Sequence, residues 1–212
     1  MISNKKFFNN FKELPVDKFI QNVLYNKESG YYTSKIPFGK TGDFLTAPGI
    51  SNLFSQIIAI WLISTWNTLD RPTKFNIVEL GPGDGSLTKI LLKIFQKFST
   101  FNQATNIFLY EKSNLLKKLQ KKNINNLKVK WIKNFNDIKK GPIIFFGNEI
   151  FDAIPVKQFS YKKNLILEKY YSLNKKNKID EIYKKASGKD VSSIKKLVIT
   201  HQKHLLVKKE IF

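Results

Sequence analysis

The sequence predicts an α/β domain built on a mostly parallel β-sheet, and two observations lead to this prediction. From residue 74 onward, short runs that are apolar on both faces alternate with segments of helical periodicity. This pattern is typical of parallel strands joined by right-handed crossover helices. In addition, three glycines stand at alternate positions in VELGPGDG, residues 78–85, directly after the first apolar run. Ligands of open parallel sheets bind beyond the carboxyl ends of the strands, so this glycine turn is the candidate site.

Four strands and their connections can be assigned in this region. The expected strands are FNIVEL (75–80), NIFLYE (106–111), LKVKWI (127–132) and PIIFFG (142–147). Helices are expected at 84–98 and 112–122, with a short connection at 134–140.

The segments before the sheet predict two helices joined by a loop. Apolar spacing predicts one helix over 14–27 and another over 51–67, with Ser51 as its N-cap. The second helix is apolar almost all round, so we expect it to be largely buried. Residues 31–51 are rich in glycine and proline and predict a long loop.

The segments after the sheet are harder to assign. VKQFSY (156–161) and LILEKYYSL (165–173) predict an antiparallel hairpin around a KKN turn. The remainder, 173–212, is lysine-rich and weakly periodic, and its candidate strands are KLVITH (196–201) and HLLVKKEIF (204–212).

Composition excludes several classes of site. The chain has no cysteine, which excludes disulfides, zinc–thiolate sites and cysteine nucleophiles, and only His201 and His204 offer imidazole ligands. We therefore predict no metal site. The longest strongly apolar run, IIAIWLI at 57–63, is too short to span a bilayer, and the N-terminus lacks the apolar region of a secretory signal. A reducing, soluble compartment is expected.

The formal net charge of +21 indicates either a functional basic surface or a compositional bias. Of the 37 basic residues all but Arg71 are lysine, and they are dispersed among abundant Asn, Ile, Phe and Tyr. An AT-rich genome would impose this joint bias on codon usage. Arginine, which proteins prefer for bidentate contacts with phosphates and bases, is almost absent. We therefore expect no specific nucleic-acid partner, and a functional basic surface stays as the alternative.

The chemistry of the glycine turn favours S-adenosylmethionine over a dinucleotide. Glycine permits positive φ and close approach of a ligand, and the helix that follows directs free N–H groups at the same space. A dinucleotide fingerprint needs its third glycine where Ser86 stands, and the Asp84 carboxylate disfavours a pyrophosphate. The sulfonium of S-adenosylmethionine is cationic and tolerates acids at Glu79 and Asp84. A tight turn without a ligand is the alternative.

Glu111 completes the predicted cofactor site. It ends the second strand, where a carboxylate can accept hydrogen bonds from both ribose hydroxyls. A solvated strand end or a helix N-cap is the alternative for this residue. The cofactor-binding residues predicted from the pattern are Glu79, Gly81, Gly83, Gly85 and Glu111.

The fourth strand ends in GNEIFDAIPVKQF, which predicts the substrate side of the site. Asn148, Glu149 and Asp152 offer an amide and two carboxylates, and the spacing of three residues can place both acids on one face. Such a cluster could hold a guanidinium or an amine, so that catalysis would rest on proximity, orientation and charge placement. An N-cap and a turn before Pro155 are the alternative.

Three motifs in this order resemble a known family. GYYTSKIPFGKTGDFLTAPGIS (30–51), VELGPGDGSL (78–87) and NEIFDAIPVKQF (148–159) resemble the MidA family of class I S-adenosylmethionine-dependent methyltransferases. The resemblance implies a Rossmann-like methyltransferase fold with an N-terminal helical cap. Its mitochondrial members are assembly factors for respiratory complex I that methylate an arginine in a core subunit. Members of the family are longer, which implies a sheet that is incomplete at the C-terminus of this chain.

The resemblance also implies further site residues and a domain division. The loop at 37–51 packs over the cofactor pocket in this family, which places Gly42, Asp43, Phe44 and Thr46 in the site. The implied division is an N-terminal helical cap with the cofactor-covering loop (1–70), a Rossmann-like core (71–172) and a lysine-rich tail or partial substrate subdomain (173–212).

The predicted function is that of a protein methyltransferase that uses S-adenosylmethionine. By resemblance it methylates an arginine of a respiratory complex I subunit and supports assembly, in the cytoplasm of a bacterium or the mitochondrial matrix of a eukaryote. The alternatives are a non-catalytic assembly chaperone with the same fold, a nucleic-acid methyltransferase and a nicotinamide dehydrogenase. NEIF stands where amino-methylating DNA enzymes carry an Asn-Pro-Pro-aromatic turn, and Ser86 disfavours the dehydrogenase.

Overall fold

The chain forms two compact units. The computed structural model describes residues 4–37, 43, 51–126, 128–138, 140–201 and 210–211. One unit comprises residues 31–153, and the other comprises 1–30 together with 154–212. The second unit is discontinuous because β1 (Glu13–Pro15) pairs with β7 (Leu165–Leu173). These two units are divided at other residues than the three segments implied by the family resemblance, which are 1–70, 71–172 and 173–212.

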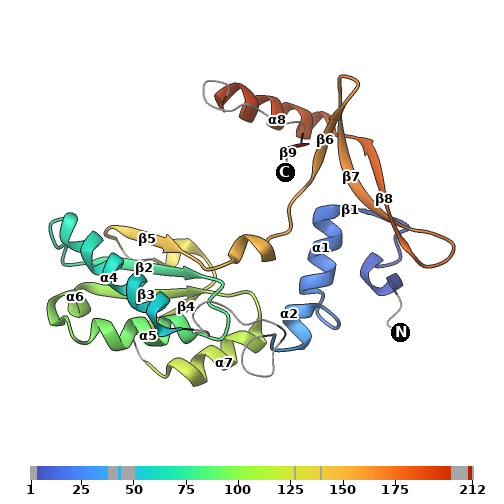
Figure 1. Ribbon diagram of the computed structural model, residues 1–212. Coiled ribbons are helices and arrows are strands. Elements are labelled where there is room, and N and C mark those ends of the chain that lie inside the picture. Colours follow the sequence, from blue (N-terminus) through green and yellow to red (C-terminus); the bar gives the residue numbers. More distant parts are fainter. Residues whose placement is uncertain are drawn as a thin grey trace. The chain divides into compact units, whose positions relative to one another are not determined.

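A four-stranded parallel sheet in the order β4-β3-β2-β5 forms the centre of the 31–153 unit (Figure 1). All four predicted strands are present, and the predicted α/β class with a parallel sheet is confirmed. The central strand β2 pairs with β3 on one side and β5 on the other, so the segments that follow these three strands emerge at one edge. The strands are β2 (Phe75–Leu80), β3 (Thr105–Tyr110), β4 (Val129–Ile132) and β5 (Ile143–Phe146).

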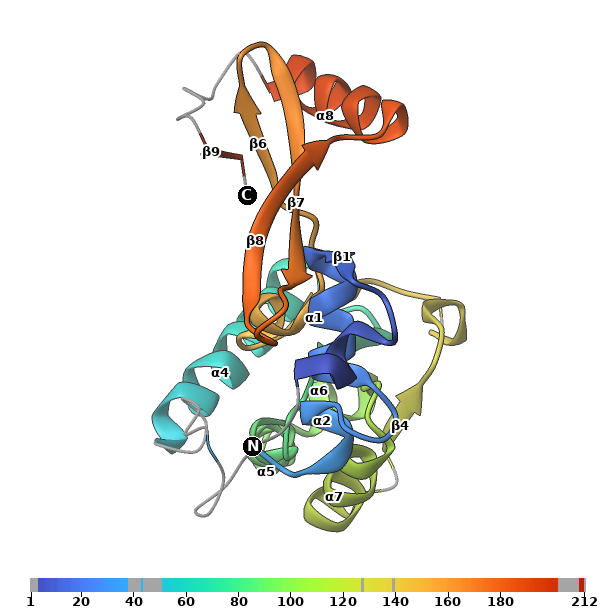
Figure 2. The same cartoon turned by 90° about the vertical axis from the view of Figure 1, so that its right-hand side faces the viewer.

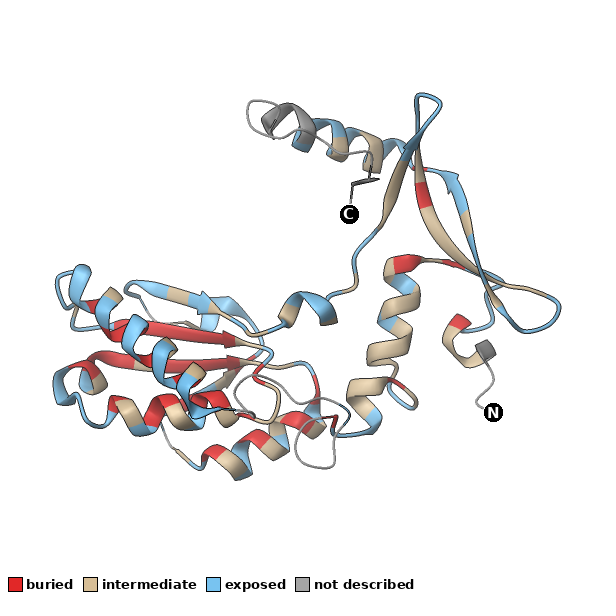
Figure 3. Cartoon of the chain, viewed as in Figure 1, coloured by how far each residue is buried: buried red, intermediate tan, exposed pale blue. Residues whose placement is uncertain are grey.

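Helices cover one face of this sheet. The apolar residues of these helices form the main core together with alternate residues of the strands, among them Phe75 and Ile77 of β2 and Ile107 and Leu109 of β3. In Figure 3 these two strands are coloured largely as buried. The other face carries a smaller cluster around Val78. The helices in the described part of this unit are α2 (Tyr31–Ser34), α4 (Asn52–Thr68), α5 (Ser86–Phe95), α6 (Ser99–Ala104), α7 (Asn114–Ile124), η2 (Phe135–Asp137) and η3 (Ile150–Ala153).

Helix α4 is only half buried, so the prediction that it is largely buried is wrong. One face packs into the core, while the other, with Leu53, Ile57, Ile60 and Trp61, is 50–62% exposed. The apolar composition does not distinguish these faces.

The centre of the discontinuous unit is an antiparallel sheet (Figure 2). Its longest strand, β7, pairs with β1, β6 and β8 (Ile179–Lys185), and β6 pairs in turn with β9 (Glu210–Ile211). The predicted hairpin is confirmed, since β6 (Phe159–Lys162) pairs with β7 around a tight turn. Aromatic rings attach the N-terminal helices η1 (Asn4–Phe8) and α1 (Val16–Tyr25) to this sheet. The ring of Phe19 lies 5.4 Å from that of Phe8 and 4.8 Å from that of Tyr171.

The C-terminal segment differs from its prediction. KLVITH is not a strand but the end of α8 (Gly188–His201). The hydroxyl of Ser187 accepts a hydrogen bond from the amide of Asp190 (3.1 Å) and donates to its carboxylate (2.6 Å), which caps the helix start. The β-branched residues in KLVITH are enriched in strands, which explains why a strand was predicted there. Of the second candidate strand, only β9 (Glu210–Ile211) lies in the described part of the chain.

None of the helices described is long and apolar enough to cross a membrane. In the described ranges, no three His, Cys, Asp or Glu side chains are grouped so that they could bind a metal ion.

Candidate functional site

The glycine turn lies at the carboxyl end of β2 and leads into α5. Gly81, Gly83 and Gly85 have φ angles of +62°, +56° and +83°, in the left-handed region that residues with a Cβ rarely adopt. The amide of Gly81 donates to the carbonyl of Tyr110 (3.0 Å), which attaches the turn to the end of β3. Gly85 is the N-cap residue of α5. The turn therefore presents backbone without side chains at a helix N-terminus.

Two neighbouring segments lie against this turn. A Cβ on Gly81 would be 2.9 Å from Cδ1 of Ile150, and a Cβ on Gly85 would be 3.0 Å from Cδ1 of Ile124. Ile150 begins η3, the short helix after β5, and Ile124 ends α7. The turn is thus in contact with the predicted substrate segment and with α7.

Glu79 lies inside the packing between β2 and α5. The residue is 3% exposed, and its carboxylate accepts a hydrogen bond from the hydroxyl of Thr88. Burial raises the pKa of Glu79 to about 7; the Thr88 hydrogen bond opposes this shift and the negative charge of Asp84 adds to it. Glu79 is therefore a buried carboxyl that titrates near neutral pH, directly below the turn.

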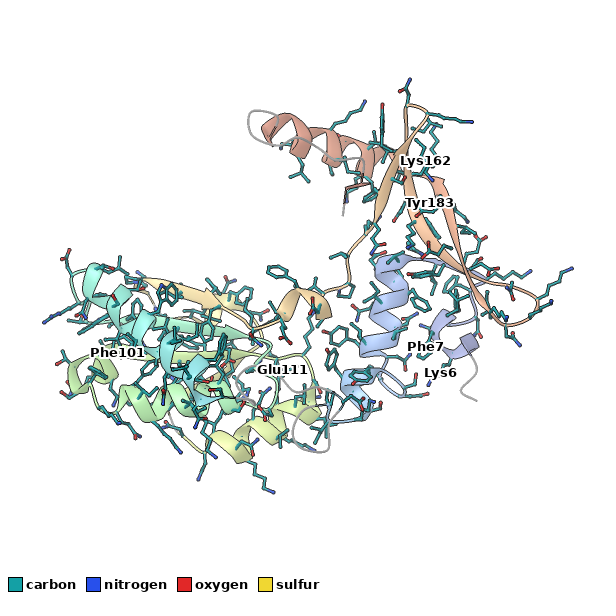
Figure 4. All side chains as sticks on the ribbon, in the orientation of Figure 1. Lys6, Phe7, Phe101, Glu111, Lys162 and Tyr183 are labelled. Carbon is teal, nitrogen blue, oxygen red and sulfur yellow. The ribbon has the colours of Figure 1, made fainter. Side chains whose placement is uncertain are left out.

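Glu111, labelled in Figure 4, directly follows β3. The side-chain amide of Gln120 connects its carboxylate to the glycine turn. Its Oε1 accepts a hydrogen bond from the amide of Ser113 (2.8 Å), and its Oε2 accepts one from Nε2 of Gln120 (3.2 Å). The same Nε2 donates to the carbonyl of Gly83 (2.8 Å). Burial raises the pKa of Glu111, and the hydrogen bonds from Ser113 and Gln120 lower it. The structure thus brings the turn and Glu111 together.

The predicted substrate-side residues follow β5. Asn148 is partly buried, whereas Glu149 and Asp152 are exposed. Glu149 has a φ of +55°, a conformation that is costly for a residue with a Cβ and that clusters at functional sites. Asp152 lies within η3, the helix whose first residue contacts Gly81.

Tyr32 of α2 is influenced by the acids that follow β3 and by those that follow β5. Its carbonyl accepts a hydrogen bond from the hydroxyl of Ser113 (2.7 Å), which anchors α2 beside Glu111. Burial raises the pKa of Tyr32, and the negative charges of Asp152, Glu111 and Glu149 raise it further. Carboxylates after β3 and after β5 therefore both act on the charge of this one phenol. A cationic group bound there would be stabilised by these charges.

The loop residues are described only in part. Gly42, Phe44 and Thr46 lie outside the described residues, and Asp43 is exposed. The Asp43 carboxylate accepts hydrogen bonds from Nζ of Lys35 and from the hydroxyl of Tyr31 (2.6 Å). These bonds, that of Lys35 first, lower the pKa of Asp43.

Two residues of the site were not predicted. Gln120 lies between Leu116 and Ile124 on the buried face of α7, and an amide on such an apolar stripe is a signal that could have identified it. Tyr32 had no comparable signal, because it is one of several aromatic residues in a segment that was predicted to be a loop.

Comparison with known proteins identifies the family. A family described as "Putative S-adenosyl-L-methionine-dependent methyltransferase" matches residues 57–210. The chain is 32% identical over 165 residues to the protein arginine methyltransferase NDUFAF7 homolog, mitochondrial, of Drosophila melanogaster. It is 30% identical over 170 residues to the protein arginine methyltransferase NDUFAF7, mitochondrial, of Homo sapiens. These matches cover 68% and 69% of this chain but only 38% of each relative.

A solved structure shows the same fold. A "likely methyl transferase" from Burkholderia thailandensis, bound to S-adenosyl-homocysteine, has a TM-score of 0.73 and 20% sequence identity, with 91% of this chain and 53% of that one covered. The Rossmann-like methyltransferase fold predicted from the sequence is therefore confirmed. Because the family match extends over more than half of the residues, the chain belongs to this family of S-adenosyl-L-methionine-dependent methyltransferases, and the resemblance to the MidA family is confirmed.

Proposed function

We propose that the chain binds S-adenosylmethionine at the glycine turn and transfers its methyl group to a nitrogen of a protein side chain. The side chain that fits best is that of an arginine. One observation carries the proposal: Nε2 of Gln120 lies 2.8 Å from the Gly83 carbonyl and 3.2 Å from the Glu111 carboxylate. The backbone of the glycine turn and an acid suited to ribose hydroxyls are thus held together. The ligand bound to the solved neighbour and the names of the relatives support the cofactor and the arginine.

The residues present fit an adenosyl ligand better than a dinucleotide. The glycine backbone at positive φ can be approached closely, and the Glu111 carboxylate stands at the strand end where an acid can accept from ribose hydroxyls. A pyrophosphate would need the free amides at the start of α5. One of these, the amide of Ser86, already donates to Oδ1 of Asp84 (2.9 Å), whose charge would repel a phosphate.

The acids after β5 suit a cationic acceptor. When bound, S-adenosylmethionine supplies an electrophilic methyl group on a cationic sulfur. In our proposal the carboxylates of Glu149 and Asp152, with the amide of Asn148, orient a guanidinium beside the turn. The pKa of arginine exceeds about 12, so a proton must leave the nitrogen as its bond to carbon forms. The carboxylate of Glu149 or Asp152 would accept that proton.

The resemblance to the MidA family supports a protein partner, and specifically a subunit of respiratory complex I. The relatives' names include the word mitochondrial, which favours the matrix if this chain is eukaryotic and is compatible with the cytoplasm if it is bacterial. A non-catalytic chaperone is less favoured, because the relatives are named as methyltransferases. In addition, this chain has a carboxylate after β3 that suits ribose hydroxyls and two carboxylates after β5 that suit a cationic acceptor.

Replacement of Glu111 by alanine should weaken cofactor binding. Loss of charged hydrogen bonds to two ribose hydroxyls is expected to reduce the affinity for S-adenosylhomocysteine by a factor of about 10 to 100. Isothermal titration calorimetry on the 212-residue chain measures this. Asp137→Ala, which removes an exposed acid of η2 in the same unit, is the control and should bind as the wild type does. Equal affinity of Glu111→Ala and wild type would contradict the proposed cofactor site.

Removal of both substrate-side carboxylates should separate binding from transfer. For the double variant Glu149→Ala/Asp152→Ala we expect unchanged affinity for S-adenosylhomocysteine. We also expect a fall of about tenfold or more in the incorporation of tritiated methyl groups into the proteins of a complex I preparation. Asp137→Ala again serves as the control. Wild-type incorporation by the double variant would remove these two acids from the mechanism.

The stability of the protein should depend on the protonation of Glu79. Its folded pKa of about 7 lies above the ordinary value of 4.5. Between these two pH values the folded chain holds a proton that the unfolded chain has lost, so the free energy of unfolding contributed by this group decreases as the pH rises and levels off above pH 7. Glu79→Gln should abolish that decrease, which amounts to roughly 3 kcal/mol.

Urea denaturation of wild type and Glu79→Gln across the range pH 4.5–8, without cofactor, measures this difference. Asp137→Asn controls for the removal of a carboxylate from the surface. Parallel stability profiles for wild type and Glu79→Gln would contradict the raised pKa.

A further inference from the structure

Gln120 is a fully buried amide whose hydrogen-bonding atoms are all used within the site. The residue is 0% exposed, in a helix whose sequence, NLLKKLQKKNI, is otherwise divided between leucine, isoleucine, lysine and asparagine. Its Nε2 donates to the carbonyl of Gly83 (2.8 Å) and to Oε2 of Glu111 (3.2 Å), and its Oε1 accepts from Nε1 of Trp131 (2.8 Å). These partners come from the turn after β2, the end of β3 and the strand β4.

The indole of Trp131 determines which way the amide points. An indole N–H can only donate a hydrogen bond, so the atom of Gln120 that faces it must be the oxygen. The NH₂ group is therefore directed at the carbonyl of Gly83 and the carboxylate of Glu111, both of which can only accept. A flipped amide would place like partners opposite each other at all three contacts.

The remaining contacts of α7 hold the same two groups. The amide of Ser113, the N-cap residue of α7, donates to Oε1 of Glu111 (2.8 Å), so each carboxylate oxygen has one fixed donor. Three residues beyond Gln120, Nδ2 of Asn123 donates to the carbonyl of Asp84 in the glycine turn (2.9 Å). A carboxylate can accept about four hydrogen bonds, so Glu111 retains acceptor capacity for a further donor beside those of Ser113, Lys112 and Gln120.

We propose that Gln120 is a positioning residue for the cofactor: through one NH₂ group it fixes the Glu111 carboxylate relative to the glycine turn, so that both meet the same nucleoside. This inference rests on the proposed function, because it concerns the binding of the proposed cofactor. It assigns no chemical step to Gln120 itself. A core position that served packing alone would be filled by leucine or methionine, because a buried amide is unfavourable unless every hydrogen bond is made.

The protonation of Glu111 provides a readout that packing alone would not change. Burial raises the pKa of Glu111, while hydrogen bonds from the amides of Ser113 and Lys112 and from Gln120, together with the charge of Lys117, lower it. The negative charge of Glu111 in turn raises the pKa of Tyr32, and the Asp84 carboxylate is directed at the amide of Ser86. Removal of the Gln120 donor should therefore raise the pKa of Glu111 further.

The test is the pH dependence of S-adenosylhomocysteine binding by the 212-residue chain, measured by calorimetry between pH 5 and 8. Gln120→Met keeps the volume and removes all three hydrogen bonds. We expect it to bind about tenfold more weakly at pH 8 and to lose affinity at a higher pH than the wild type as the pH is lowered. Trp131→Phe keeps the ring and removes only the donor that orients the amide, and it should shift both values in the same direction by a smaller amount.

A structural control separates positioning from stability. Leu116→Ala removes a buried side chain one turn earlier on the same face of α7, so it should lower the free energy of unfolding without moving the pH dependence of binding. If Gln120→Met does not fold, Trp131→Phe carries the test. Wild-type affinity and pH dependence in the folded variants would overturn the inference and leave the proposed function standing. No binding by the wild type would overturn both.

Discussion

The left-handed backbone of the glycine turn is the constraint on which the arrangement of the site depends. Three positive φ angles within five residues reverse the chain between β2 and α5, and they fall at glycines, which have no Cβ. The parallel register then determines what can stand beside the turn. Because β2 pairs with β3 and β5, the next segments at that edge are Glu111 on one side and Asn148 to Asp152 on the other. The order of strands thus brings the acid proposed to bind the ribose and the groups proposed to bind the substrate to one turn.

Side-chain contacts then fix the positions of the glycine turn and of Glu111 relative to each other, which the strand pairing alone would not. Helix α7 contacts the turn through Gln120, Asn123 and Ile124, and it contacts Glu111 through Ser113 at its N-cap. The hydroxyl of Ser113 also binds the carbonyl of Tyr32, which carries α2 to the same edge. A ligand between the turn and these acids would therefore meet groups whose positions are set before it arrives, which is the usual basis of catalysis by orientation.

Much of this could be predicted from the sequence, and the failures have identifiable causes. The strands of the parallel sheet were predictable because both of their faces are apolar, and the turn was predictable because its glycines follow the first strand. Gln120 was not, because its partners are 37 and 9 residues away and only the folded chain brings them together. The exposed face of α4 was missed because composition does not report which neighbours a helix has. In the last helix, the cap formed by Ser187 and Asp190 outweighs the strand preference of KLVITH.

A crystal structure of the chain with S-adenosylhomocysteine would show directly whether the glycine turn and Glu111 bind one nucleoside. We expect the nucleoside to lie against Gly81, Gly83 and Gly85, with the ribose hydroxyls on the Glu111 carboxylate and with the Gln120 amide still bonded to Gly83. The sulfur should point toward the segment that contains Glu149 and Asp152. A nucleoside bound elsewhere on the sheet, or ribose hydroxyls that bind a different acid, would exclude the proposed cofactor site.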